Sequence, residues 1–193
     1  HAIPTFQDIS RPMYHPDGQS IAMTLGKVDR DLAELTWDPT SSPHNYKESV
    51  VARSILREGD AQYQPGGDAI AFFSERSGSK QLWLQEHESL IQLSKDDTTT
   101  PLDYFVWSSN GEQIAAIRDK QLTLFNKQGL LQTIDLPFRA LRLFQWNEQD
   151  QLLMKVLGSQ GAELVAYDIG TAQAQTLYSG YIHWAQSYQD QVL

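Results

Sequence analysis

An aromatic residue, a tight turn and an apolar strand recur along the chain at a nearly regular spacing. Copies begin at Tyr14, Tyr63 and Trp107, and in each of these an Ile-Ala pair starts seven residues after the aromatic. A weaker copy begins at Trp146, and a fifth, partial copy is expected to begin at Trp184. Successive aromatics are 49, 44, 39 and 38 positions apart. Self-similarity at such a period indicates a chain built from stacked copies of one supersecondary unit.

The residues between each aromatic and its strand are turn formers. The first three copies have glycine four residues after the aromatic, at Gly18, Gly67 and Gly111. Glycine adopts the positive φ that many tight turns need. The fourth copy has Asp150 at this position. Aspartate tolerates the left-handed region better than most residues, so we expect this turn to survive.

The repeat length and its content predict an all-β fold. A unit of roughly 40 to 45 residues with four short strands is one blade of a β-propeller. No stretch combines helical length with a 3.6-residue period. We therefore expect about four blades of four antiparallel strands and the start of a fifth, forming an incomplete propeller. The expected blades cover residues 9–56, 57–94, 102–136 and 141–178, with 179–193 opening the next one.

The first two copies carry a longer motif. The first reads Tyr-His-Pro-Asp-Gly-Gln-Ser-Ile-Ala over residues 14–22, and in the second, Ser-Glu-Arg-Ser-Gly over 74–78 is followed by Leu-Trp-Leu over 82–84. This pattern resembles the repeat of TolB-like and WD40-like β-propeller proteins, in which a Ser-Pro-Asp-Gly turn, a strand, Ser-Asp-Arg-x-Gly and a second strand follow the aromatic. The third copy keeps only the Asn-Gly turn. The resemblance implies the fold, whereas propellers carry many unrelated functions.

Composition excludes several classes of partner and site. The formal charge of −9 and the pI near 4.9 argue against direct contact with nucleic acid or an anionic membrane surface. No apolar run approaches the roughly 20 residues that span a bilayer, so no membrane insertion by this segment is expected. The chain has no cysteine, which excludes disulfides and thiolate metal sites. It begins with His1, so we expect an excised or processed piece.

No constellation of residues predicts catalysis. The five histidines are scattered, without the spacing of a metal site, so neither a metal nor a cofactor is expected. The stretch over residues 18–22 partly matches a nucleophile elbow around Ser20, but that elbow needs a following helix, and a strand is expected here. We therefore expect a protein that is not an enzyme.

Two features supply candidate binding residues. Lys27, Arg76 and Lys120 each lie six residues after the isoleucine of their repeat, so equivalent blades would place them on one rim. That rim would contact an anion or a peptide carboxylate; the alternative is charged turns that maintain solubility. The segment 38–47 has two prolines and is expected to be a long loop, with His44 and Tyr46 as candidates for binding. The alternative is a tolerated insertion.

The expected function is that of a non-enzymatic sensor or protein-interaction propeller. The chain resembles the extracytoplasmic propeller regions of membrane-anchored winged-helix transcription regulators of the CadC and ToxR kind. This implies a periplasmic location and a tether outside the segment. The alternatives are a TolB-like periplasmic adaptor that binds envelope proteins, and the propeller part of a prolyl-oligopeptidase-like serine peptidase. An open propeller exposes a sheet face and an edge, so we expect a protein partner or self-association. No small-molecule ligand is indicated.

Overall fold

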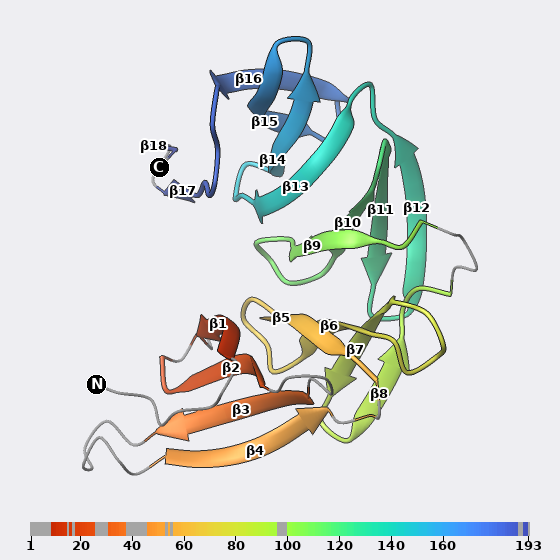
Figure 1. Cartoon of the computed structure of the whole chain (residues 1–193), viewed down its shortest axis with the longest axis vertical. Helices are drawn as coiled ribbons and strands as arrows, with labels where there is room; N and C mark the ends of the chain where they lie inside the picture. The colour runs from red at the N-terminus through yellow and green to blue at the C-terminus, as the bar shows by residue number, and fades with distance from the viewer. Residues whose placement is uncertain are drawn as a thin grey trace. The chain divides into compact units, whose positions relative to one another are not determined.

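A computed structural model describes residues 9–14, 16, 18–25, 31–37, 46–52, 54, 56–95, 100–188 and 191–192. The chain divides into two compact units, His1–Thr98 and Thr99–Leu193, and each contains two four-stranded antiparallel sheets (Figure 1). In every sheet the strands pair in sequence order. The described residues contain no helix, and hence none that could cross a membrane. The expectation of an all-β fold built from four-stranded antiparallel blades is confirmed.

Blade 1 is the first sheet of the first unit. Its strands are β1 (Ile9–Tyr14), β2 (Ser20–Leu25), β3 (Asp31–Trp37) and β4 (Tyr46–Ala52). Tyr46 and Lys47 were expected in the loop 38–47, but they are the first two residues of β4. Tyr46 pairs with Trp37, and the ladder begins there because two facing aromatics favour strand pairing. His44 lies outside the described residues.

Blade 2 completes the first unit. Its strands are β5 (Glu58–Tyr63), β6 (Ile70–Ser74), β7 (Gln81–Glu86) and β8 (Ser89–Gln92). Every residue of β6 is buried, as its continuous apolar run predicts. Ala22 and Leu32 of blade 1 share an apolar cluster with Tyr63 and Phe72 of blade 2. The Tyr63 hydroxyl also donates a hydrogen bond of 2.6 Å to the Glu34 carboxylate, so the two blades are joined by a polar contact as well.

The second unit contains blades 3 and 4 and a short hairpin. The strands of blade 3 are β9 (Asp103–Trp107), β10 (Ile114–Arg118), β11 (Gln121–Asn126) and β12 (Gly129–Asp135). Those of blade 4 are β13 (Arg139–Trp146), β14 (Gln151–Gly158), β15 (Gly161–Asp168) and β16 (Gln173–Ser179). The hairpin consists of β17 (Ser187–Tyr188) and β18 (Gln191–Val192).

The repeated turn has the expected left-handed residue in most copies. Gly18, Gly111 and Asp150 have φ values of 71°, 70° and 61°. The Asp150 carboxylate also accepts a 2.6 Å hydrogen bond from the Trp146 indole, so the turn residue holds the aromatic of its own repeat. The expectation that aspartate preserves this turn is confirmed.

The second copy forms its turn one residue earlier. Its residue of positive φ is Gly66, at 68°, rather than Gly67. The Gly67 N–H donates to the Gln64 carbonyl at 3.2 Å, which makes Pro65 and Gly66 the central pair of the turn. Proline followed by a left-handed glycine is the arrangement of a type II turn. The first copy also has proline two residues after its aromatic but Asp17 after that proline, so the extra glycine at Gly66 accounts for the earlier left-handed residue.

The next copy of the repeat begins later than the sequence suggested. The hairpin after blade 4 pairs Tyr188 with Gln191. Tyr188 thus ends a first strand as Trp146 does, and it follows Trp146 by 42 positions. Trp184 precedes the hairpin and lies in the connecting segment instead. Two residues separate the strands of this hairpin, whereas four separate β13 from β14.

Candidate functional site

The two faces of blade 4 have different environments. Side chains alternate between the faces of a strand. Leu152, Met154 and Tyr167 lie on one face and are buried in a single apolar cluster with residues of blade 3. The residues that blade 3 contributes to this cluster include Val106, Ala115, Ile117, Leu122 and Leu124. This face is therefore covered by another sheet.

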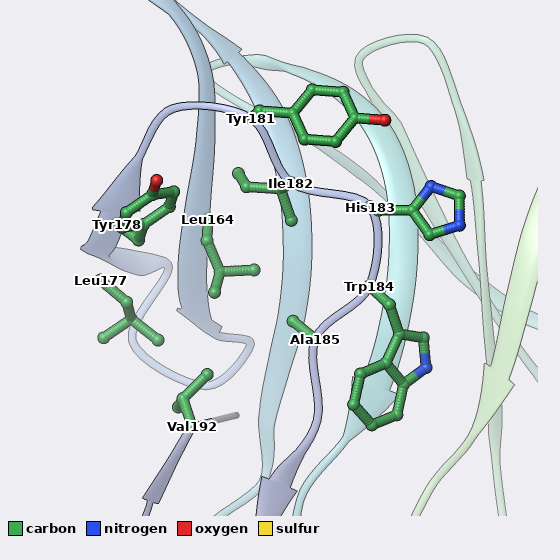
Figure 2. Close-up of a pocket in the computed structure, with 9 residues that line it drawn as sticks. All are labelled: Leu164, Leu177, Tyr178, Tyr181, Ile182, His183, Trp184, Ala185 and Val192. Atoms are coloured by element: carbon green, nitrogen blue, oxygen red, sulfur yellow. The ribbon is translucent and has the colours of Figure 1, made fainter.

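Among the described residues, an irregular segment packs on the opposite face of blade 4. Leu153 and Leu164 on this face pack against Ile182 and Ala185, which belong to residues 180–186, here called the crossing segment. Figure 2 shows Ile182 and Ala185 on the sheet side of the segment, with His183 directed away from the sheet. The segment buries the Ile182 and Ala185 side chains and leaves those of Tyr181, His183 and Trp184 exposed.

Polar side chains of blade 4 hold the crossing segment in place. The Lys155 ammonium donates to the Ile182 carbonyl at 3.0 Å, and the Arg142 guanidinium donates to the His183 carbonyl at 3.4 Å. Directly after the segment, the Gln145 side chain accepts from the N–H of Ser187, the first residue of β17, at 2.7 Å. Irregular backbone needs such partners because it lacks a strand ladder. The position of the segment is therefore determined by the sheet beneath it.

A hollow of about 630 Å³ lies between the crossing segment and the end of β16. We call it the blade 4 hollow. Its lining residues are Leu164, Leu177, Tyr178, Tyr181, Ile182, His183, Trp184, Ala185 and Val192 (Figure 2). Tyr181 is 87% exposed, Trp184 57% and Tyr178 54%, whereas Trp146 of the same blade is 5% exposed. Clustered exposed aromatics next to an apolar floor are typical of binding surfaces.

Two groups at the end of β15 have shifted pKa values. Burial, and next the charge of Asp168, raise the pKa of Tyr167. The Thr171 backbone N–H donates to the Asp168 carboxylate at 2.8 Å and lowers the pKa of Asp168. The two groups are the last residues of β15, and the Tyr167 ring is buried in the cluster shared with blade 3. Within the described ranges, no group of three or more His, Asp or Glu side chains could hold a metal ion. The arrangement is suited to contact with apolar groups.

The predicted site residues occupy different surroundings. Arg76 is paired with the buried Glu58 carboxylate inside blade 2. Lys120 is exposed in the turn between β10 and β11, and Tyr46 is partly exposed at the start of β4. Lys27, like His44, lies outside the described residues. Because Arg76 and Lys120 belong to separate units, the shared rim stays a prediction.

The blade 4 hollow was not predicted from the sequence. Its signal is the stretch Leu-Tyr-Ser-Gly-Tyr-Ile-His-Trp over residues 177–184, which concentrates aromatics between two repeats. The repeat spacing made Trp184 the start of a fifth copy, which gave no reason to expect it at a binding surface. The density of aromatics in a connecting segment, rather than their period, would have indicated the site.

Comparison with known proteins identifies the fold. The sequence matches no protein-family profile and no curated protein. A TolB structure from Acinetobacter baumannii is 13% identical with a TM-score of 0.68, over 92% of this chain and 45% of that one. A puromycin hydrolase is 15% identical with a TM-score of 0.69, over 89% of this chain and 28% of that one. The structure of a nidogen/laminin complex is 11% identical with a TM-score of 0.64, over 90% of this chain and 65% of that one.

These similarities define the class of protein as a β-propeller assembled from four-stranded blades. At such low identity they show the fold alone. The chain spans 28% of the puromycin hydrolase and 45% of the TolB protein. The TolB-like propeller fold expected from the repeat motif is thus confirmed.

Proposed function

We propose that this chain is a non-enzymatic protein-interaction propeller, and that it binds its partner through the blade 4 hollow. The observation that carries the proposal is the exposure of Tyr178, Tyr181 and Trp184 around an apolar floor. Tyrosine and tryptophan dominate binding energy at protein interfaces because they bury a large apolar area while keeping a polar group. The partner would insert an apolar side chain beside Leu164 and Ala185.

The surrounding contacts support this use of the hollow. The crossing segment is held by hydrogen bonds to Lys155 and Arg142, and Ser187 directly after it is held by Gln145, so the lining residues are positioned before a partner arrives. A surface organised in advance loses less conformational entropy on binding than a disordered one. The floor formed by Leu164, Ile182 and Ala185 is already packed, and the exposed aromatics remain available for contact.

Site-directed photo-crosslinking followed by a binding measurement tests the proposal. A photo-reactive phenylalanine analogue replaces Tyr181, and in the control it replaces Leu130, a 61% exposed apolar residue of β12 in the same unit. The partner captured only from the Tyr181 position is then purified and titrated by calorimetry. We expect the Tyr181→Ser/Trp184→Ser double variant to bind it at least tenfold more weakly and Leu130→Ser less than twofold more weakly. Equal affinity of both variants would overturn the proposal.

The cellular role that we propose for this interaction is extracytoplasmic signalling. The repeat motif resembles that of periplasmic regions attached to winged-helix transcription regulators, and DNA binding would then belong to a separate domain. The likeness to TolB supports the alternative role of a periplasmic adaptor for envelope proteins. The reading frame around this segment distinguishes them: a basic winged-helix segment and a spanning helix upstream support the regulator, and a secretion signal with a small α/β domain supports the adaptor.

A second candidate is the propeller part of a serine peptidase. The likeness to a puromycin hydrolase favours it, because the similarity covers 89% of this chain but 28% of that protein. In this case a hydrolase domain would be attached, and the propeller would control access to it. A fluorophosphonate probe should leave this chain unlabelled under either proposal. Labelling of the isolated chain would contradict its non-enzymatic role.

A further inference from the structure

Arg142 of β13 lies between two aromatic rings. Its guanidinium carbon is 5.3 Å from the centre of the Tyr104 ring and 5.4 Å from the centre of the Phe144 ring. Such contacts attract a cation to the negative face of the ring and fix the orientation of the guanidinium plane. Tyr104 comes from blade 3 and Phe144 from blade 4, so the tertiary structure assembles this group.

Both rings are presented by irregularities in the strands. The register of β9 with β10 passes from Phe105 to Asp103, so Tyr104 is the extra residue of a bulge. Its φ of 44° is unusual for a bulky side chain. The register of β13 with β14 likewise passes from Leu143 to Gln145, and Phe144 is the extra residue. Bulges redirect side chains and are frequent beside functional sites.

The Arg142 guanidinium has no carboxylate partner among the described residues. Its only hydrogen bond there is the 3.4 Å contact with the His183 carbonyl, which uses one of the five N–H donors that arginine carries. By contrast, Arg76 stacks on Phe72 and Trp83 at 5.5 and 5.2 Å but is also paired with Glu58. In a chain of net charge −9, an aromatic-held cation without an acidic partner is an unusual feature.

We propose that Arg142 is a carboxylate-binding site that extends the blade 4 hollow. Its ligand would be a peptide with an apolar side chain next to a carboxylate, supplied by a chain terminus or by an acidic residue. The contact with the His183 carbonyl places the cation beside a residue that lines the hollow. A guanidinium binds both carboxylate oxygens at once, which a lysine cannot reproduce. This inference rests on the proposed peptide-binding role of the hollow.

A peptide titration followed by amide NMR tests the proposal. The probes are acetyl-Ala-Leu-Phe with a free carboxylate, the same peptide with a C-terminal amide, and acetyl-Asp-Leu-Phe amide. We expect the wild-type chain to bind at least one carboxylate peptide fivefold or more tightly than the uncharged peptide at low salt. Preference for the first probe identifies a terminal carboxylate as the ligand, and preference for the third identifies a side chain. Equal affinities, or no binding by any probe, would overturn the proposal.

Variants of two arginines on the same strand locate the effect. Arg142→Gln should abolish the preference, and Arg142→Lys should retain part of it. The matched control is Arg139→Gln, which removes an exposed cation that is paired with Asp119 at 3.0 Å and should keep the full preference. If Arg142→Gln fails to fold, the Arg142→Lys variant and the wild-type affinities for the three peptides still show whether Arg142 binds a carboxylate.

Different results would refute the carboxylate site and the proposed function. Binding of the uncharged peptide with no preference for a carboxylate refutes the role of Arg142 and leaves the hollow as a binding surface. A carboxylate preference that depends on Arg142, together with unchanged partner binding by the Tyr181→Ser/Trp184→Ser variant, refutes the proposed function instead.

Discussion

Blade 2 and blade 4 each contain an arginine stacked on two aromatic rings, but only the arginine of blade 2 is paired with a carboxylate among the described residues. In blade 2, Arg76 stacks on two aromatics and is neutralised by Glu58, which is fully buried. In blade 4, Arg142 stacks on two aromatics and keeps most of its donors free of protein partners within the described residues. Stacking on aromatic rings therefore does not by itself determine the role of an arginine. The presence of a carboxylate separates a structural cation from one available to a ligand.

The same contrast holds for the aromatic residues of the two regions. Tyr63 of blade 2 is buried and its hydroxyl is bound by Glu34 of blade 1. Tyr181 and Trp184 beside blade 4 are exposed. A neighbouring sheet covers the first residue, whereas the crossing segment holds the other two outward. Exposure in this fold is therefore decided by what packs on a blade rather than by the residue type.

The largest effect is expected from Arg76→Ala. The substitution leaves the Glu58 carboxylate buried without its cation, and breaking a buried pair costs about 3 to 5 kcal/mol. The free energy of unfolding, measured by urea denaturation, should fall by this amount. A loss below about 1 kcal/mol, the range of surface ion pairs, would show that Arg76 is no more structural than Arg142.

A smaller loss is expected when both members of that pair are replaced. The Glu58→Leu/Arg76→Leu variant removes the buried charge together with its partner, so it should unfold at a higher urea concentration than Arg76→Ala. Each single leucine variant serves as a control in a double-mutant cycle. Additive losses would indicate that the two side chains do not act as a pair.

For Arg142→Ala we expect a loss of only about 0.5 to 1 kcal/mol. The substitution removes cation–aromatic contacts of a partly exposed guanidinium but leaves no carboxylate unpaired. Thermal and urea unfolding measure the change, with Arg139→Ala as a reference on the same strand. A loss as large as that of Arg76→Ala would make Arg142 a structural residue and remove the basis of the comparison.

The smallest change in stability is expected from Trp184→Ser, within about 0.5 kcal/mol, because the indole is already 57% exposed. Its measurable effect should be on partner binding. Trp146→Phe, which removes the indole donor to Asp150 from a buried position, is the matched control and should lower stability more. Equal losses from the two variants would show that Trp184 supports the fold.

Much of the fold follows from local sequence. Gly18, Gly111 and Asp150 have the left-handed conformation that their turn positions require, and the strands begin close to the expected residues. These features depend on φ preferences and on short-range hydrogen bonds, which a few neighbouring residues determine. The incorrect predictions concern residues whose place in a strand depends on the residue that pairs with them. Tyr46 joins its strand through Trp37, and Tyr188 replaces Trp184 at the end of a strand.

The repeated blade, with its length, its turns and its buried strands, can be predicted from local sequence. The candidate site depends on tertiary packing. Tyr178, Tyr181 and Trp184 surround a hollow because the crossing segment packs Ile182 and Ala185 onto blade 4. Arg142 meets Tyr104 because bulges in two strands of different blades turn their aromatics toward it. Turn geometry depends on residues close in sequence, whereas exposure and stacking depend on residues that only folding brings together.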